Sequence, residues 1–72
     1  MPKLIIMITD PNVTSEQLRK AGASASPQEI QDAMDKAKTQ LSIAKNYGYG
    51  DDEAAAYWTI RIIDLCSLRA KQ

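Results

Sequence analysis

Residues 26–47, with the sequence SPQEIQDAMDKAKTQLSIAKNY, decide the fold because they contain the clearest helix start and the most regular apolar spacing in the chain. Ser26 can cap a helix, Pro27 fits the first helical position, where no amide donor is needed, and Glu29 completes a capping box. Apolar residues then recur at alternating spacings of four and three, at Ile30, Met34, Ala37, Leu41 and Ala44. This spacing predicts an amphipathic helix over residues 27–47.

A second long helix is predicted over residues 51–70, after the short turn Tyr-Gly-Tyr-Gly at residues 47–50. Acidic side chains at its start and basic ones at its end complement the helix dipole. A connection this short forces the two long helices into an antiparallel hairpin.

The apolar residues of this last helix cover about half of its circumference on a helical wheel. They are Ala54, Ala55, Trp58, Ile62, Ile63, Leu65 and Cys66. Further large side chains, Tyr57, Ile60 and Leu68, lie outside that arc. The last helix is therefore apolar over more of its surface than one neighbouring helix can cover, and we expect Cys66 to be a buried core thiol.

The N-terminal segment over residues 3–9, KLIIMIT, is rich in β-branched residues and is followed by a turn of sequence Asp-Pro-Asn. These features predict a short strand over residues 3–9. A short helix over residues 14–21 should follow, since Thr14 and Gln17 have the spacing of a capping box.

A lone strand leaves backbone donors and acceptors unpaired along both edges. Pairing with the same strand of a second copy, through Leu4, Ile6 and Ile8, would satisfy one edge. The predicted fold is therefore mainly α with a minor β part. It is a single domain of residues 1–72, whose strand pairs across a homodimer.

The composition limits what can stabilise so small a domain, because chains of this size usually need a disulfide, a metal or a partner subunit. Cys66 is the only cysteine among the 72 residues and there is no histidine, so an intramolecular disulfide or a structural zinc site cannot form. Self-association is the remaining support, in agreement with the homodimer.

The nine basic and nine acidic residues are spread evenly along the chain. This balance argues against nucleic acid as a partner, because binding to phosphates requires a basic surface. The longest apolar run, over residues 4–8, is too short for a membrane-spanning helix or a signal peptide. We therefore expect no membrane association and a cytoplasmic location.

Three features that could carry enzyme chemistry are better explained by structure. Without histidine, Cys66 lacks the usual base that activates a nucleophile. Gly48 and Gly50 precede a helix, but the three carboxylates that follow them would repel a phosphate. Three consecutive carboxylates on a helix also point about 100° apart and do not converge on a metal ion. We expect no enzyme activity, no cofactor and no metal site.

All four aromatic residues, Tyr47, Tyr49, Tyr57 and Trp58, lie within twelve residues near the turn of the hairpin. Tyr and Trp are enriched in the central residues of protein interfaces. A partner-binding hypothesis therefore includes Tyr47, Tyr49, Asp51, Asp52 and Glu53. The other interpretation is that Trp58 belongs to the core and the tyrosines only cover the turn.

The sequence thus favours a small non-enzymatic protein-binding module, such as an adaptor, an inhibitor or an accessory regulator from a phage or other mobile element. Its expected partners are a second copy of itself and an unidentified protein. The alternative is a DNA-binding transcriptional regulator that dimerises through the strand, in which Lys3, Arg19 and Lys20 gather into a basic surface.

Overall fold

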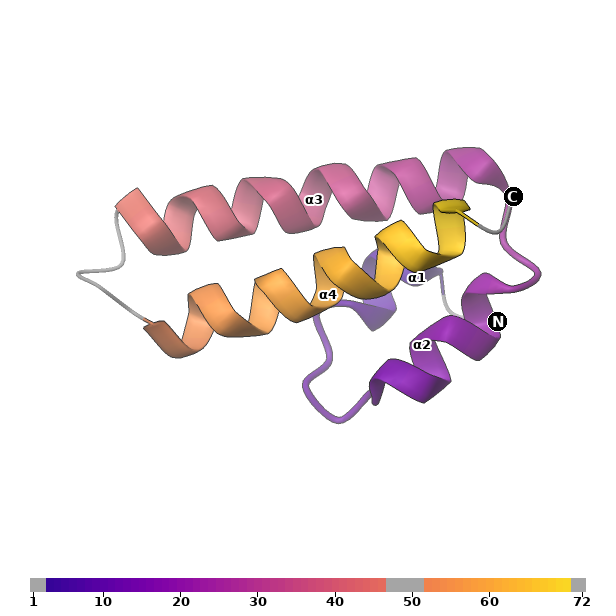
Figure 1. Cartoon of the computed structure of the whole chain (residues 1–72), viewed down its shortest axis with the longest axis horizontal. Coiled ribbons are helices and arrows are strands. Elements are labelled where there is room, and N and C mark those ends of the chain that lie inside the picture. Colours follow the sequence, from indigo (N-terminus) through magenta and orange to yellow (C-terminus); the bar gives the residue numbers. More distant parts are fainter. Residues whose placement is uncertain (1–2, 47–51, 71–72) are drawn as a thin grey trace.

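The computed structural model describes residues 3–46 and 52–70, and within these ranges the chain forms four helices and no strand (Figure 1). The helices are α1 (Leu4–Met7), α2 (Ser15–Gly22), α3 (Pro27–Asn46) and α4 (Asp52–Ala70). The two long helices lie side by side, α1 contacts α3, and α2 contacts α4 (Figure 1). The predicted antiparallel pair of long helices is therefore confirmed.

Two predicted helix starts are also observed. Thr14 Oγ1 accepts a hydrogen bond from the Gln17 amide at 3.1 Å, and Gln17 Oε1 accepts one from the Thr14 amide at 2.9 Å, so the capping box of α2 is confirmed. At the start of α3, Ser26 Oγ accepts from the Glu29 amide at 3.2 Å. The Glu29 carboxylate accepts from the Leu4 amide at 3.3 Å, which ties the start of α1 to the start of α3.

The predicted strand over residues 3–9 is wrong, because residues 4–7 form the short helix α1. Leu4 and Ile8 are one helical turn apart and both are buried, whereas Ile6 is 59% exposed. The backbone also satisfies itself locally, since the Ile8 amide donates to the Leu4 carbonyl at 3.0 Å. The unpaired strand edges that motivated a dimer through Leu4, Ile6 and Ile8 are therefore absent from the described chain, and strand pairing is not retained.

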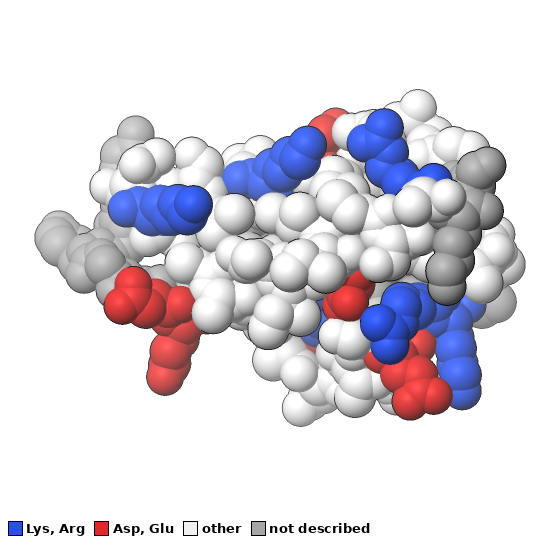
Figure 2. Space-filling view, viewed as in Figure 1, with Lys and Arg blue, Asp and Glu red and all other residues white. Residues whose placement is uncertain are grey.

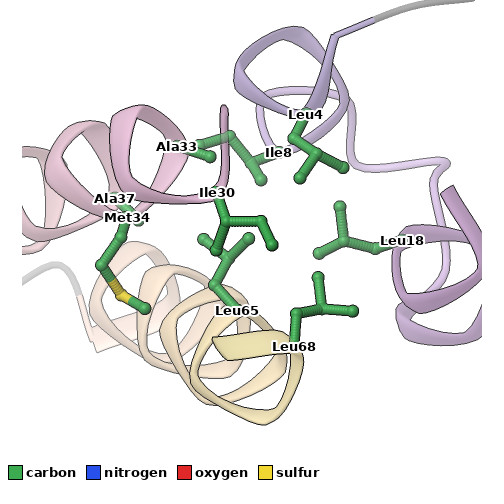
Figure 3. Close-up of a cluster of buried hydrophobic side chains, with 9 residues drawn as sticks. All are labelled: Leu4, Ile8, Leu18, Ile30, Ala33, Met34, Ala37, Leu65 and Leu68. Atoms are coloured by element: carbon green, nitrogen blue, oxygen red, sulfur yellow. The ribbon is translucent and has the colours of Figure 1, made fainter. Parts of the chain in front are cut away.

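A cluster of buried apolar side chains from all four helices forms the core (Figure 3). Its members are Leu4, Ile8, Leu18, Ile30, Ala33, Met34, Ala37, Leu65 and Leu68. The stripe predicted on α3 is buried at Ile30, Met34, Ala37 and Ala44, and half-buried at Leu41. The regular apolar spacing of residues 26–47 therefore identifies the face of α3 that faces the core.

The predicted orientation of α4 is wrong in part. Cys66 is exposed rather than a core thiol, and Ile63 is 59% exposed. Leu68, which the helical wheel places outside the apolar arc, is buried together with the charged residues Arg61 and Asp64. The helix turns this polar side inward, where Arg61 binds the connection between α1 and α2 and Asp64 lies near Arg19 of α2.

Candidate protein-contact surface

The inner face of α4 contains a buried arginine that binds backbone carbonyls. Arg61 is only 4% exposed. Its Nη2 atom lies 2.9 Å from the Asp10 carbonyl oxygen and 2.7 Å from the Val13 carbonyl oxygen. Both carbonyls belong to the connection between α1 and α2. Arg61 therefore fastens this connection to α4 through charge-assisted hydrogen bonds.

Tyr57 extends this contact by one helical turn. Its hydroxyl donates to the Ile8 carbonyl oxygen and lies 3.1 Å from Arg61 Nη2. The Arg61 guanidinium also lies over the Tyr57 ring, with its Cζ atom 4.9 Å from the ring centroid, a cation–π arrangement. Trp58 meets the Tyr57 ring edge-on and packs against the core cluster. Both aromatic side chains at the start of α4 are therefore structural.

Asp64 completes the inner polar face one turn after Arg61. It is 5% exposed, and its Oδ1 atom lies 3.8 Å from Arg19 Nη1 on α2. Within residues 3–46 and 52–70, Asp64 Oδ2 and Arg61 Nε have no hydrogen-bond partner. Burying charged groups costs desolvation free energy, which an imperfect pair offsets only in part. Burial of this polar face therefore costs free energy that the hydrogen bonds and the ion pair only partly offset.

The outer face of α4 shows the opposite chemistry. Ile60 and Ile63 are 52% and 59% exposed, and Ala56, Thr59 and Cys66 around them are exposed as well. Between Glu53 and Arg69 the charged residues of the helix are Arg61 and Asp64, both of which face inward. Figure 2 shows the resulting uncharged surface over the middle of α4, with basic side chains along α3 and acidic side chains near the start of α4. We call Ala56, Thr59, Ile60, Ile63 and Cys66 the outer face of α4.

The residues predicted to bind a partner are only partly described. Asp52 and Glu53 are exposed in the first turn of α4, at one end of the outer face. Tyr47, Tyr49 and Asp51 lie outside the described residues. The predicted site did not include Ile60, Ile63 or the other residues of the outer face.

The signal for the inner face was present in the sequence. Tyr57, Arg61, Asp64 and Leu68 recur at spacings of four, three and four, as regular as the apolar stripe of α3. A wheel that counts only apolar residues overlooks this stripe. Long side chains can bury their stems and rings while their polar ends bind carbonyls.

A shallow cavity of about 430 Å³ lies where the starts of α1 and α3 meet. It is lined by Lys3, Ile5, Ser26, Gln28, Glu29 and Asp32. The charges on its wall are of both signs, and the Glu29 carboxylate already accepts the Leu4 amide. In the described part of the chain, no three acidic or cysteine side chains are grouped so that they could hold a metal ion.

Comparison with known proteins gives no match. No protein-family model, no curated protein and no solved structure matches this chain. None of the described helices has both the length and the hydropathy of a membrane-spanning helix. The function of the chain is therefore inferred from its own surfaces.

Proposed function

We propose that this chain is a small non-enzymatic protein-binding module and that the outer face of α4 is its contact surface. The observation that carries the proposal is the reversal on one helix: Ile60 and Ile63 are exposed while Arg61 and Asp64 are buried. Ile60 and Ile63 are three residues apart and lie next to each other on the helix, so they form a continuous apolar patch. Such patches, bordered by polar residues, are typical of protein interaction sites.

The remaining chemistry agrees with a binding role. Tyr57, Arg61 and Asp64 would be the natural groups for acid–base or phosphate chemistry. All three side chains instead make contacts within the fold, to Ile8, Asp10, Val13 and Arg19. An adaptor, an inhibitor or an accessory regulator from a phage or other mobile element, acting in the cytoplasm, needs only a stable scaffold and one exposed face.

The DNA-binding alternative loses its basis. It required a strand over residues 3–9, where the structure has a helix. Two of its three candidate cations have acidic neighbours, since Lys20 lies 3.6 Å from Glu16 and Arg19 lies 3.8 Å from Asp64. We do not propose DNA binding.

The test compares two isoleucines of equal exposure. Ile63 on α4 and Ile6 on α1 are each 59% exposed, so Ile6→Lys is a matched control for Ile63→Lys. The wild-type chain and both variants are tagged, expressed in the native host beside an untagged wild-type copy, and recovered with cross-linked proteins for mass spectrometry. The retained protein can be a host protein or the untagged chain itself.

The proposal expects the wild type and Ile6→Lys to retain the same protein, and Ile63→Lys to lose it while remaining helical by circular dichroism. Retention by all three chains would contradict the assignment to α4. Loss from both variants would do so as well, because it would show that any added charge abolishes the contact.

A further inference from the structure

We infer that the outer face of α4 binds a second copy of this chain, with the two α4 helices packed antiparallel about a two-fold axis between residues 60 and 63. This inference rests on the proposed function and names its partner. It uses a different surface from the predicted strand pairing, which the structure does not support. Three properties of the described residues support it: apolar self-complementarity, the arrangement of charge, and the exclusion of the parallel alternative.

The apolar patch is self-complementary in an antiparallel pair. A two-fold axis midway between Ile60 and Ile63 places Ile60 of one copy against Ile63 of the other, and the same contact is repeated on the far side of the axis. Ala56 lies one turn before Ile60 and Ser67 one turn after Ile63, and these two positions then face each other. Small side chains there allow the helix axes to approach to about 8–10 Å.

The charge distribution is complementary in the same arrangement. The start of α4 carries the exposed carboxylates Asp52 and Glu53. Beside its later half lies α2, where Arg19 contacts Asp64 and Gly22 lies against Leu68. The last turn of α2 carries Arg19 and Lys20, both exposed, and Arg69 is exposed in the last turn of α4; Glu16, 3.6 Å from Lys20, offsets part of this charge and leaves the end net basic. One end of this surface is therefore acidic and the other end basic.

Glu53 lies on the side of α4 that α2 borders. Glu53 and Asp64 are eleven residues apart, which is about three helical turns, so both point to the same side of α4. A two-fold axis perpendicular to the helices leaves this side of α4 on the same side of the dimer in both copies and reverses the direction of the second helix. Glu53 of each copy therefore faces the Lys20 end of α2 in the other copy. A parallel pair would instead bring acidic start against acidic start and is disfavoured by repulsion.

Analytical ultracentrifugation of the full chain tests the dimer. At a loading concentration of about 100 μM, which would detect even a weak dimer, we expect a mass near twice the 8.0 kDa of one chain. Ile63→Lys should sediment as a monomer and Ile6→Lys as a dimer. A monomeric wild type, or a dimer that Ile63→Lys leaves intact, overturns the inference.

A charge exchange tests the orientation. Glu53→Lys and Lys20→Glu should each raise the dimer dissociation constant by about fivefold, since an exposed ion pair contributes little and the two-fold axis repeats it. The double variant Glu53→Lys/Lys20→Glu should return the constant to within about twofold of the wild type, because the reversed charges again attract. Additive weakening in the double variant overturns the antiparallel arrangement.

These outcomes separate the inference from the function on which it rests. If the wild type is a monomer but Ile63→Lys loses a host protein in the recovery experiment, self-association is wrong and protein binding through α4 stands. If Ile63→Lys loses neither the second copy nor a host protein, both fail.

Discussion

Helices α3 and α4 have nearly equal lengths, 20 and 19 residues, and pack against each other, yet they differ in which side chains they bury beside their core leucines and isoleucines. α3 follows the usual amphipathic rule, with Ile30 and Met34 inside and none of its charged residues buried. α4 buries Arg61 and Asp64 and exposes Ile60 and Ile63. The comparison teaches that apolar content alone does not fix how a helix is rotated. In α4, the carbonyls of the α1–α2 connection select the polar side.

The largest expected effect comes from the buried cation of α4. Arg61→Met keeps the aliphatic stem but removes the donors to the Asp10 and Val13 carbonyls. Leaving these part-buried acceptors unpaired should lower the free energy of unfolding by about 3 kcal/mol. Urea unfolding followed by circular dichroism measures this loss. An unchanged or increased stability would show that α4 does not depend on its polar inner face.

The corresponding change on α3 removes a conventional core residue. Met34 is 1% exposed within the core cluster, so Met34→Ala should cost about 2–3 kcal/mol through lost burial and the cavity that remains. The same urea titration compares the two helices directly. A cost of less than about 1 kcal/mol would mean that Met34 is not a packed core residue.

Removing one hydrogen bond of the inner face should have a smaller effect on the free energy of unfolding. Tyr57→Phe keeps the ring over which Arg61 lies and removes the hydroxyl that donates to the Ile8 carbonyl. The expected loss is about 1–2 kcal/mol, the cost of an unpaired buried acceptor. Thr59→Val on the exposed side of the same helix turn is the control and should change stability by less than about 0.5 kcal/mol. Equal effects of the two substitutions would contradict the assigned network.

The smallest effect is expected on the outer face. At a protein concentration low enough to keep the chain monomeric, Ile63→Lys should change the free energy of unfolding by less than about 0.5 kcal/mol, because the side chain is already 59% exposed. A loss comparable to that of Met34→Ala would place Ile63 in the core and remove the contact surface.

The parts of the fold that sequence reasoning predicted are those determined by local signals. The capping residues Thr14 and Gln17 mark the start of α2, and the apolar spacing after Pro27 marks the buried face of α3. The strand predicted for the N-terminal segment was wrong because a short apolar run is compatible with either a strand or a helix. Tertiary contacts decide it: Leu4 and Ile8 lie in the core, whereas Ile6, which would share their face in a strand, is 59% exposed.

The contact surface was foreseen only as an excess of apolar residues on the last helix. The wheel counted Ile63 and Cys66 as core and left Leu68 out, because it gave no weight to Arg61 and Asp64. Which side of such a helix is buried depends on acceptors far away in sequence, 48 and 51 residues from Arg61 in this case. The spacing of Tyr57, Arg61, Asp64 and Leu68 marks this face of the helix, but it does not identify the carbonyls that the face binds.

Cys66 reports the rotation of α4, because it lies on the outer face and is the only thiol in the chain. The measurement is the rate at which Cys66 reacts with a small aromatic disulfide reagent under native conditions, at a concentration that keeps the chain monomeric. A small free thiol, measured at the same pH and ionic strength, serves as the reference. An exposed Cys66 should react within about tenfold of the reference and without waiting for unfolding. Reaction that occurs only at the rate of global unfolding would mean that Cys66 is buried, that α4 presents its apolar arc inward, and that the outer face described for it is wrong.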